Sequence, residues 1–377
     1  MSEALLRAEE DTPEGFAEEP IELAWYGCDL KSGQIVEELP TLSPSGPLTK
    51  RLGMSTSTSF SLRLEEAGRD WLAATDPGRS LLVCVDTLTG QPVWAGIVLT
   101  RDAGSGWTAG LGAATPEAYL DRRFTGDQTL IQQDQAAIVT ALMAAPLAQG
   151  PPFVMDAPAL GVLADFVGLD ADDRTVLSAL QEVMGAEGGP EWTVDVAWAD
   201  SSRTGFVLPV RVRAAIGAQS AAPEAVFDYP GCVSTYTLAE SYEAAKGATV
   251  VVARGEGEGA GRLSSPVQIA TDLEAAGWPR WVYRYTPASG LTDPDRLAAH
   301  ARQALALMQT GATVWTVEAA ASRAPRLGRD WGIGDSVRIA VDSSPRHPAG
   351  ADVIARAWAW ELDAAANVVR PILVEED

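Results

Sequence analysis

The chain has 377 residues, of which 46% are apolar, and its 28 basic and 51 acidic residues give a net charge of −23. This length and composition predict a folded protein of two or three domains, each with a real hydrophobic core. So acidic a surface disfavours binding to nucleic-acid phosphates or to anionic membranes, and no apolar stretch is long enough to span a bilayer.

The three cysteines, Cys28, Cys84 and Cys232, are far apart in the sequence and include no CxxC pair. This scatter disfavours a disulfide framework and a zinc site, so we expect thiols buried in the core. The N-terminus is acidic and lacks the apolar segment of a signal peptide. We therefore expect the protein to be made and assembled in the cytoplasm.

Residues 1–20 form an acidic N-terminal arm. It contains one basic residue, Arg7, and seven acidic residues: Glu3, Glu9, Glu10, Asp11, Glu14, Glu18 and Glu19. Alone, such a segment is expected to be a solvated coil. Its apolar residues Ala4, Leu5 and Leu6 offer a means of pinning it to a neighbour.

Residues 21–115 have the pattern of a first β-barrel domain. Short runs rich in apolar and β-branched residues, bounded by Gly, Pro and Ser, predict strands at 21–26, 34–39, 57–64, 80–86 and 93–99. A loop rich in Pro, Ser and Gly is expected over 40–53. Strands of this length and spacing are typical of a small barrel or sandwich.

A helix-containing insert domain is expected over 116–200 and a β-rich domain over 201–290. Apolar residues at helical spacing predict helices over 129–144 and 172–184, and alternation predicts strands at 191–198 and 205–212.

Residues 291–377 are expected to form a helix plus a second β-barrel domain. Thr292 or Asp293 can cap the helix, Pro294 suits its first turn, and the apolar face ends near Met308. Strands follow at 312–318, 336–341, 353–362 and 368–374. The predicted fold class is mainly β with α+β insertions, in which two small β-barrel domains flank mixed helical and β segments.

The stretch 224–262 contains two β-branched runs and then a run of glycines, which suggests a phosphate-binding loop. It lacks the GxGxxG spacing and a GK[ST] motif, and Glu256 and Glu258 would repel a phosphate. We interpret the stretch as a structural crossing between β modules. Its expected packing anchors are Phe227, Tyr229, Tyr236 and Tyr242, and Gly255, Gly257 and Gly259 belong to a flexible acidic loop that waits for a partner.

Candidate chemistry is sparse. The two histidines, His300 and His347, lie near no GxSxG, HExxH or spaced cysteine, and with 51 acidic residues chance carboxylate neighbours carry no information. Most of the twelve tryptophans lie in strand patterns among apolar neighbours and are expected in the core. We therefore expect no catalytic residue, cofactor, metal or specific nucleic-acid site.

Taken together, these features resemble the siphophage tail-tip hub, or minor tail protein, family, which is similar to the contractile-phage baseplate hub. The residues that carry the resemblance are 28–35, 94–98, 189–194, 227–231, 241–242, 248–257, 328–337 and 347–348. Gly334 and Asp335, within one of these segments, join the aromatic and glycine residues above as assembly candidates.

The resemblance implies two small β-barrels per subunit and a homotrimer that forms a pseudo-sixfold ring at the virion tail tip. Implied partners are the distal tail protein, the tape-measure protein and tail fibre or spike proteins, and DNA leaves through the ring. The alternative is a tail-tip protein that binds or hydrolyses cell-wall glycans. The chain stops soon after its last expected strand, which puts a hydrolase extension in doubt.

Overall fold

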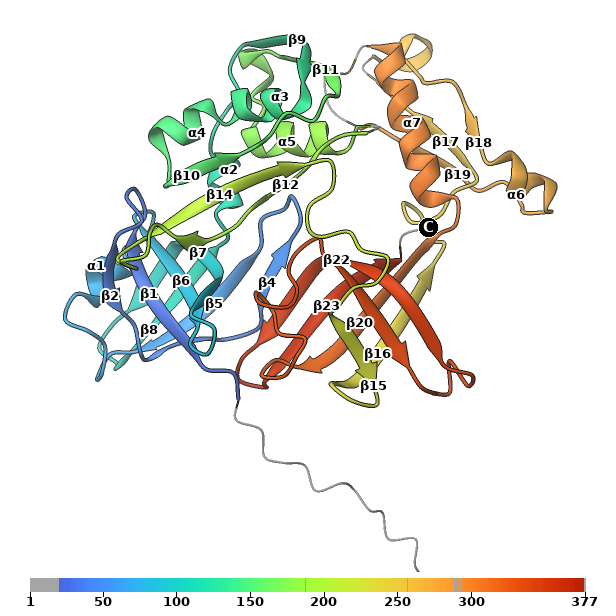
Figure 1. Ribbon diagram of the computed structural model, residues 1–377. Coiled ribbons are helices and arrows are strands. Elements are labelled where there is room, and N and C mark those ends of the chain that lie inside the picture. Colours follow the sequence, from blue (N-terminus) through green and yellow to red (C-terminus); the bar gives the residue numbers. More distant parts are fainter. Residues whose placement is uncertain (1–19, 187, 256, 288–290, 292, 376–377) are drawn as a thin grey trace, which may run out of the picture.

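The computed structural model describes residues 20–186, 188–255, 257–287, 291 and 293–375. Two antiparallel-rich sheets lie side by side and curve like barrels (Figure 1). A mixed α/β unit, residues 117–213, packs on the first sheet, and a small α/β unit, residues 246–311, projects from the second. This architecture confirms the predicted fold class.

The first sheet has seven strands in the order β2-β1-β6-β7-β8-β5-β3, all antiparallel. Its elements are β1 (Leu23–Asp29), β2 (Ile35–Glu38), β3 (Leu42–Pro44), β5 (Ser57–Arg63), α1 (Trp71–Ala74), β6 (Ser80–Asp86), β7 (Gln91–Ala103) and β8 (Thr108–Ala114). All seven residues of β6 are buried, because the sheet is covered on both faces. Its inner face packs around Trp25, Phe60 and Trp94, and its outer face meets the α/β unit.

The unit over residues 117–213 is called the insert unit here. It comprises α2 (Glu117–Leu120), β9 (Gln128–Asp134), α3 (Gln135–Leu142), α4 (Ala144–Gln149), β10 (Phe153–Asp156), β11 (Leu163–Gly168), η1 (Asp170–Asp172), α5 (Val176–Met184), β12 (Glu191–Val194), β13 (Ala197–Trp198) and β14 (Phe206–Arg213). Strand β14 alternates strictly between buried and half-buried residues. Its buried face, from Phe206 to Val212, joins the helices and the outer face of the first sheet in one core.

The second sheet has the order β15-β21-β22-β23-β20-β16, and β4 also pairs with β22. Its strands are β4 (Leu48–Arg51), β15 (Val226–Tyr229), β16 (Val233–Ser241), β20 (Ala312–Ala320), β21 (Ser336–Val341), β22 (Ala351–Asp363) and β23 (Val368–Glu375). The two sheets share one continuous hydrophobic cluster, which runs from Trp25 and Phe60 to Trp315 and Leu373. The sheets are therefore joined by apolar packing as well as by β4.

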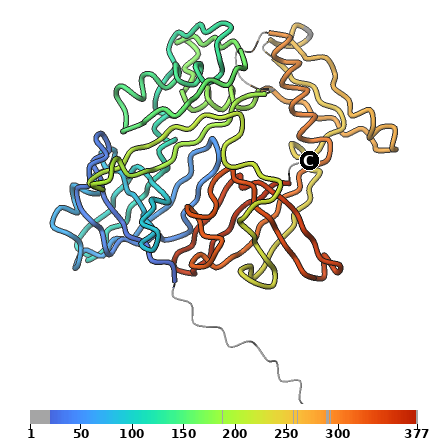
Figure 2. The backbone as a smooth tube through the Cα atoms, viewed as in Figure 1, coloured from blue at the N-terminus to red at the C-terminus, as the bar shows by residue number. Residues whose placement is uncertain are grey.

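The unit over residues 246–311 is called the small unit here, and it stands between β16 and β20. It contains β17 (Val250–Ala253), η2 (Gly259–Gly261), β18 (Gln268–Ile269), α6 (Thr271–Ala275), β19 (Val282–Tyr285) and α7 (Pro294–Met308). Its sheet has the order β18-β17-β19, and α7 packs on one face of it through Leu297, Ala301 and Met308. The backbone trace places this unit beside the insert unit (Figure 2), and Nη2 of Arg296 on α7 donates to Oε1 of Glu182 on α5 at 2.9 Å.

The second sheet is built from segments that are far apart in the chain, so the structural units do not follow one another in sequence order. The second sheet takes β15 and β16 from before residue 290, β20 to β23 from after it, and β4 from the N-terminal part. The stretch 224–262 crosses between modules, since β16 belongs to the second sheet and β17 to the small unit. Sequence reasoning placed strands well but could not place them in sheets.

Two helix predictions had different outcomes. Helix α7 has Asp293 as its N-cap, accepting a hydrogen bond from the Asp295 amide at 2.8 Å, and ends at Met308 as predicted. The prediction of one helix over 129–144 is wrong in its first half, because 128–134 is strand β9. Strand β9 pairs with β11, and Asp134 then caps α3, so pairing with a distant segment overrides the local helical spacing.

Candidate assembly site at the junction of the units

Phe227, Tyr229 and Tyr236, three of the predicted anchors, lie inside the second sheet. Phe227 is fully buried and forms a T-shaped pair with the Trp331 ring, with ring centroids 5.5 Å apart. Tyr236 packs against Tyr229 and Trp315, and its hydroxyl lies 2.7 Å from Nδ1 of His347. Through His347, Tyr236 fixes the loop between β21 and β22 over the sheet, whereas Phe227 packs against the segment before β21.

Tyr242, the fourth anchor, lies where the small unit leaves the second sheet. Its ring packs against Trp278 and Trp281, at centroid distances of 5.4 and 6.0 Å. Its hydroxyl donates a 3.3 Å hydrogen bond to the carbonyl oxygen of Gln309. Tyr242 therefore stabilises the joint between the two modules.

The three loop glycines have different surroundings. Gly255 is buried, and a Cβ there would collide with the carbonyl oxygen of Leu291. Gly257 and Gly259 are exposed and have φ angles of +111° and +56°, a region that favours glycine. The acidic residue Glu256 lies outside the described residues. Gly255 thus has a packing role, whereas the other two allow the turn.

Gly334 and Asp335 hold the linker between β14 and β15. The carboxylate of Asp335 accepts hydrogen bonds from the amides of Ala218 and Gly332, both at 2.7 Å. Gly334 has φ +85°, and a Cβ there would collide with the carbonyl oxygen of Ile216. The linker can approach this turn so closely only because residue 334 has no side chain.

Replacing Gly334 with alanine is therefore expected to lower the free energy of unfolding by about 2–4 kcal/mol, from backbone strain plus steric overlap. Urea denaturation of purified protein measures this loss. Gly104→Ala is the matched control, since nothing lies within 4 Å of the added methyl group. Equal stabilities of the two variants would contradict the packing role of Gly334.

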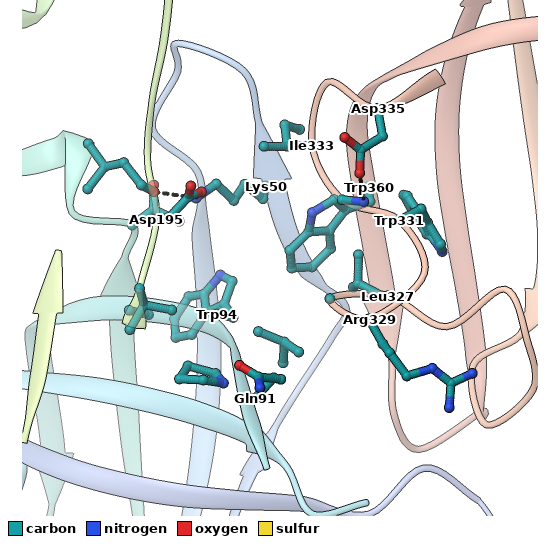
Figure 3. A pocket seen from close by; sticks show the side chains of 18 of the residues that line it. Lys50, Gln91, Trp94, Asp195, Leu327, Arg329, Trp331, Ile333, Asp335 and Trp360 are labelled. Atoms are coloured by element: carbon teal, nitrogen blue, oxygen red, sulfur yellow. Dashed lines mark hydrogen bonds and ion pairs between the residues drawn. The ribbon is translucent and has the colours of Figure 1, made fainter. Parts of the chain in front are cut away.

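A cavity of about 350 Å³ lies where the two sheets and the insert unit meet (Figure 3). Trp94 and Gln91 border it from the first sheet, Asp195 from the insert unit, and Trp360 from the second sheet. Lys50, on β4, reaches into this space from between the two sheets. Sequence analysis did not predict this site, because its lining residues come from widely separated parts of the chain, which also include the loop from Leu327 to Asp335.

The charges at the cavity are paired with one another. Nζ of Lys50 donates to Oδ1 of Asp195 at 3.1 Å and also contacts the carbonyl oxygen of Val194. Oδ2 of Asp195 accepts a hydrogen bond from Nε of Arg211. Burial alone would raise the pKa of Asp195, but Lys50 and Arg211 outweigh it and hold the pKa below its ordinary value. The cluster thus ties β4 to the insert unit.

Glu117, at the start of α2, is fully buried close to this cluster. Neither of its carboxylate oxygens accepts a hydrogen bond in the described part of the chain. Burial raises the pKa of Glu117, and the nearby charge of Lys50, together with polar contacts to Thr115 and to backbone groups that fall outside hydrogen-bond geometry, only partly opposes this. A buried carboxylate without hydrogen bonds destabilises the folded state when it is ionised.

Glu117→Gln is accordingly expected to raise the free energy of unfolding at about pH 7. The pKa of Glu117 is higher in the folded state than in the unfolded state. The wild-type protein therefore loses stability as the pH rises from the unfolded-state pKa of Glu117 through its folded-state pKa. The gain of the variant should therefore vanish at about pH 3, where Glu117 is protonated in both states. Denaturation curves across this pH range test it, with exposed Glu66→Gln as control; a variant less stable at neutral pH would contradict it.

Two further buried ion pairs join the units. Arg326 donates to both carboxylate oxygens of Asp86 at 2.5 and 2.8 Å, which links the loop after β20 to the end of β6. Arg356 on β22 donates to both carboxylate oxygens of Glu191 on β12. At most 4% of either arginine side chain is exposed; Asp86 is fully buried, and Glu191 is 13% exposed.

Two cysteines and His300, whose side chains could take part in catalysis or metal binding, are buried in the packed interior. Cys28 and Cys84 are buried, and burial raises the pKa of the Cys28 thiol to about 12. His300, on α7, is buried beside Glu182 and Gly185 of the insert unit, and its burial lowers its pKa. Among the described residues, no group of three or more His, Cys, Asp or Glu is placed to hold a metal ion. None of the helices within the described ranges is long and apolar enough to cross a membrane.

Comparison with known proteins gives matches in structure alone. No protein-family model matches the sequence, and no curated protein matches it. The structure is similar to a tail protein from Neisseria meningitidis MC58, with a TM-score of 0.56 and 15% identity over 94% of this chain and 97% of that chain.

Two prophage proteins match over a similar extent. The 43 kDa tail protein of prophage MuSo2 from Shewanella oneidensis gives a TM-score of 0.56 and 12% identity, over 94% of this chain and 98% of that one. Prophage tail protein gp18 from Listeria monocytogenes EGD-e gives 0.52 and 10%, over 94% of each chain. The chain therefore shares the fold of phage tail proteins over nearly its whole length, which confirms the resemblance in fold predicted from the sequence.

Proposed function

We propose that this chain is a structural subunit of a phage tail, and more specifically a tail-tip hub subunit. The observation that carries this proposal is the match in fold to three phage or prophage tail proteins over 94% of the chain. The hub joins the tail tube and the distal tail protein to the components of the tip, and DNA leaves through its centre.

Two features of the molecule support a ring subunit. The chain contains two curved sheets side by side that share one hydrophobic cluster. Three copies would supply six such sheets, so a homotrimer matches a sixfold tube with pseudo-sixfold symmetry. Buried ion pairs fix the sheets and the insert unit against one another, as a load-carrying ring requires.

The proposed partners are the distal tail protein on the tube side, and the tape-measure protein with tail fibre or spike proteins at the tip. The protein would be assembled in the host cytoplasm and reside in the virion tail tip. The net charge of −23 would line the channel with excess acid, so that the exiting DNA is repelled rather than retained. A channel found to be neutral or basic would contradict this part of the proposal.

Native mass spectrometry of the purified full chain tests the hub proposal. We expect a mass of three copies, and electron microscopy of the same sample should show rings with a central channel. A chain that stays monomeric both alone and with the distal tail protein would contradict the proposal.

A further inference from the structure

The small unit has a sheet face that α7 does not cover. On the covered face, Val251 and Ala253 of β17 and Tyr283 and Tyr285 of β19 pack in the core of α7. Successive residues of a strand point to opposite faces, so Val250 and Val252 point away from the helix. The three strands thus present a second face on the side opposite to α7.

Strand register defines the composition of this second face. Val250 pairs with Ile269 on β18 and with Val282 on β19, which gives one row of three aliphatic side chains. Val252 pairs with Arg284 in the next row, and Arg254 follows along β17. We name these six residues the valine–arginine face: Val250, Val252, Arg254, Ile269, Val282 and Arg284. Val250 and Val252 are buried at its centre, whereas Val282 is 56% exposed, so the aliphatic row opens to solvent along β19.

The charge of this region differs from that of the rest of the chain. Residues 246–311 contain seven Lys or Arg and six Asp or Glu, whereas the whole chain contains 28 and 51. Arg284 is exposed, and neither Arg254 nor Arg284 forms an ion pair with a carboxylate within the described ranges. Many other arginines do, including Arg213, Arg338 and Arg346. An aliphatic strip beside guanidinium groups without a carboxylate partner suits a segment that is apolar and acidic.

We propose that the acidic arm, residues 1–19, of a second copy of this chain binds the valine–arginine face. The arm has seven carboxylates and one arginine, so its charge complements the face. Its apolar residues Leu5 and Leu6 are followed by Glu9 and Glu10. Residues four apart in an extended chain are about 13 Å apart, which is also the spacing from Val250 to Arg254 along β17. In an extended arm Leu5 and Glu9 point to the same side, so Leu5 can meet the aliphatic row at its exposed end, Val282, while Glu9 meets an arginine.

The position of the arm favours a second copy over its own face. The described chain starts beside the turn after β22, where the Ile21 amide donates to Oδ1 of Asn367 at 3.1 Å and the Ala321 amide donates to the Asn367 carbonyl. The small unit departs at the opposite end of β20, beside the pair Ser241 and Ala312. From Ala312 to Ala321 these two points are about 30 Å apart along the strand. Arm and face thus leave opposite ends of the sheet, which suits contact between successive copies.

A labelled peptide of residues 1–20 tests the contact. The receptor is the full chain with Glu9, Glu10 and Asp11 changed to lysine, so that its own arm does not compete. We expect saturable binding by fluorescence anisotropy at about 0.05 M salt and much weaker binding at about 0.5 M. Adding Arg254→Glu and Arg284→Glu to the receptor should weaken binding about tenfold or more, and Val282→Lys should also weaken it.

Arg63→Glu, an exposed arginine on β5, is the matched control and should leave binding unchanged. Charge reversal on both sides should restore the contact. A peptide with lysine at positions 9, 10 and 11 should therefore bind a full chain that combines Arg254→Glu and Arg284→Glu with the natural arm. Absence of binding, or equal loss with Arg63→Glu, would overturn the site.

Mixing two full-length variants tests whether the arm acts between copies. One variant has Glu9, Glu10 and Asp11 changed to lysine, so its arm and its face are both basic. The other carries Arg254→Glu with Arg284→Glu, so its arm and its face are both acidic. A tagged copy of one should retain the other more strongly than it retains its own kind. No preference for the mixed pair would overturn the second copy as the source of the arm. Neither readout requires the hub ring, so the contact and the proposed function can fail separately.

Discussion

Arg326→Ala is expected to lower the free energy of unfolding by about 3–5 kcal/mol, which is a large part of the stability of a typical domain. The substitution leaves the fully buried carboxylate of Asp86 without its counter-ion. It also removes the hydrogen bond from Nη1 of Arg326 to the carbonyl oxygen of Ser322, at 2.8 Å. An uncompensated buried charge costs far more than the loss of an exposed ion pair.

Chemical denaturation of the full chain measures this effect. The double variant Asp86→Asn with Arg326→Met should lose less than Arg326→Ala alone, because no buried charge remains unpaired. Arg338→Ala, which breaks the exposed pair with Asp352, is the control and should cost at most about 1 kcal/mol. A loss for Arg326→Ala as small as that of the control would show that this pair does not hold the sheets together.

The pair also has a defined pH dependence. Burial would raise the pKa of Asp86, but hydrogen bonds and charge from Arg326 outweigh it and hold the pKa below its ordinary value. Its stabilising contribution is therefore present above the ordinary aspartate pKa and is lost as the pH falls through the folded-state value. The difference between wild type and Arg326→Ala should accordingly shrink in acid.

Local sequence patterns predicted most strands because burial on one or both faces leaves a periodic or continuous apolar run. The run at 80–86 and the capped helix ending at Met308 are clear cases. Strand β4 was missed, since four residues inside a Pro-, Ser- and Gly-rich stretch gain their strand structure only from β22, about 310 residues later in the chain. Strand β9 shows the same dependence on a distant partner.

The junction was harder to predict than the strands. Phe227 and Tyr236 were selected as anchors because large aromatic residues in strands are usually buried, but the ion pairs Asp86–Arg326 and Glu191–Arg356 were not. With 51 acidic and 28 basic residues, sequence alone cannot choose the partners. One signal was present: Asp86 ends a run of apolar residues, and Arg356 lies inside a long apolar strand, where charges need partners.

Of the two buried arginines, Arg356 connects more parts of the structure than Arg326 does. Its Nε donates to the carbonyl oxygen of Gly334 at 2.8 Å, and Nη2 donates to that of Ile216 at 2.7 Å. The remaining donors hold Glu191, whose Oε2 also accepts the Ile216 amide at 2.7 Å. One planar guanidinium thus connects β22, the insert unit, the linker after β14 and the turn at Gly334.

Arg356→Lys is therefore expected to cost about 2–4 kcal/mol, although it conserves the charge. A lysine ammonium has three donors at one point and cannot reach a bidentate carboxylate and two separate carbonyl groups at once. The linker over 214–224 should then be cleaved faster in limited proteolysis, because its carbonyl and amide contacts loosen. The exposed Arg338→Lys is the control. If Arg356→Lys matched this control in stability and cleavage rate, charge alone rather than guanidinium geometry would hold the linker in place.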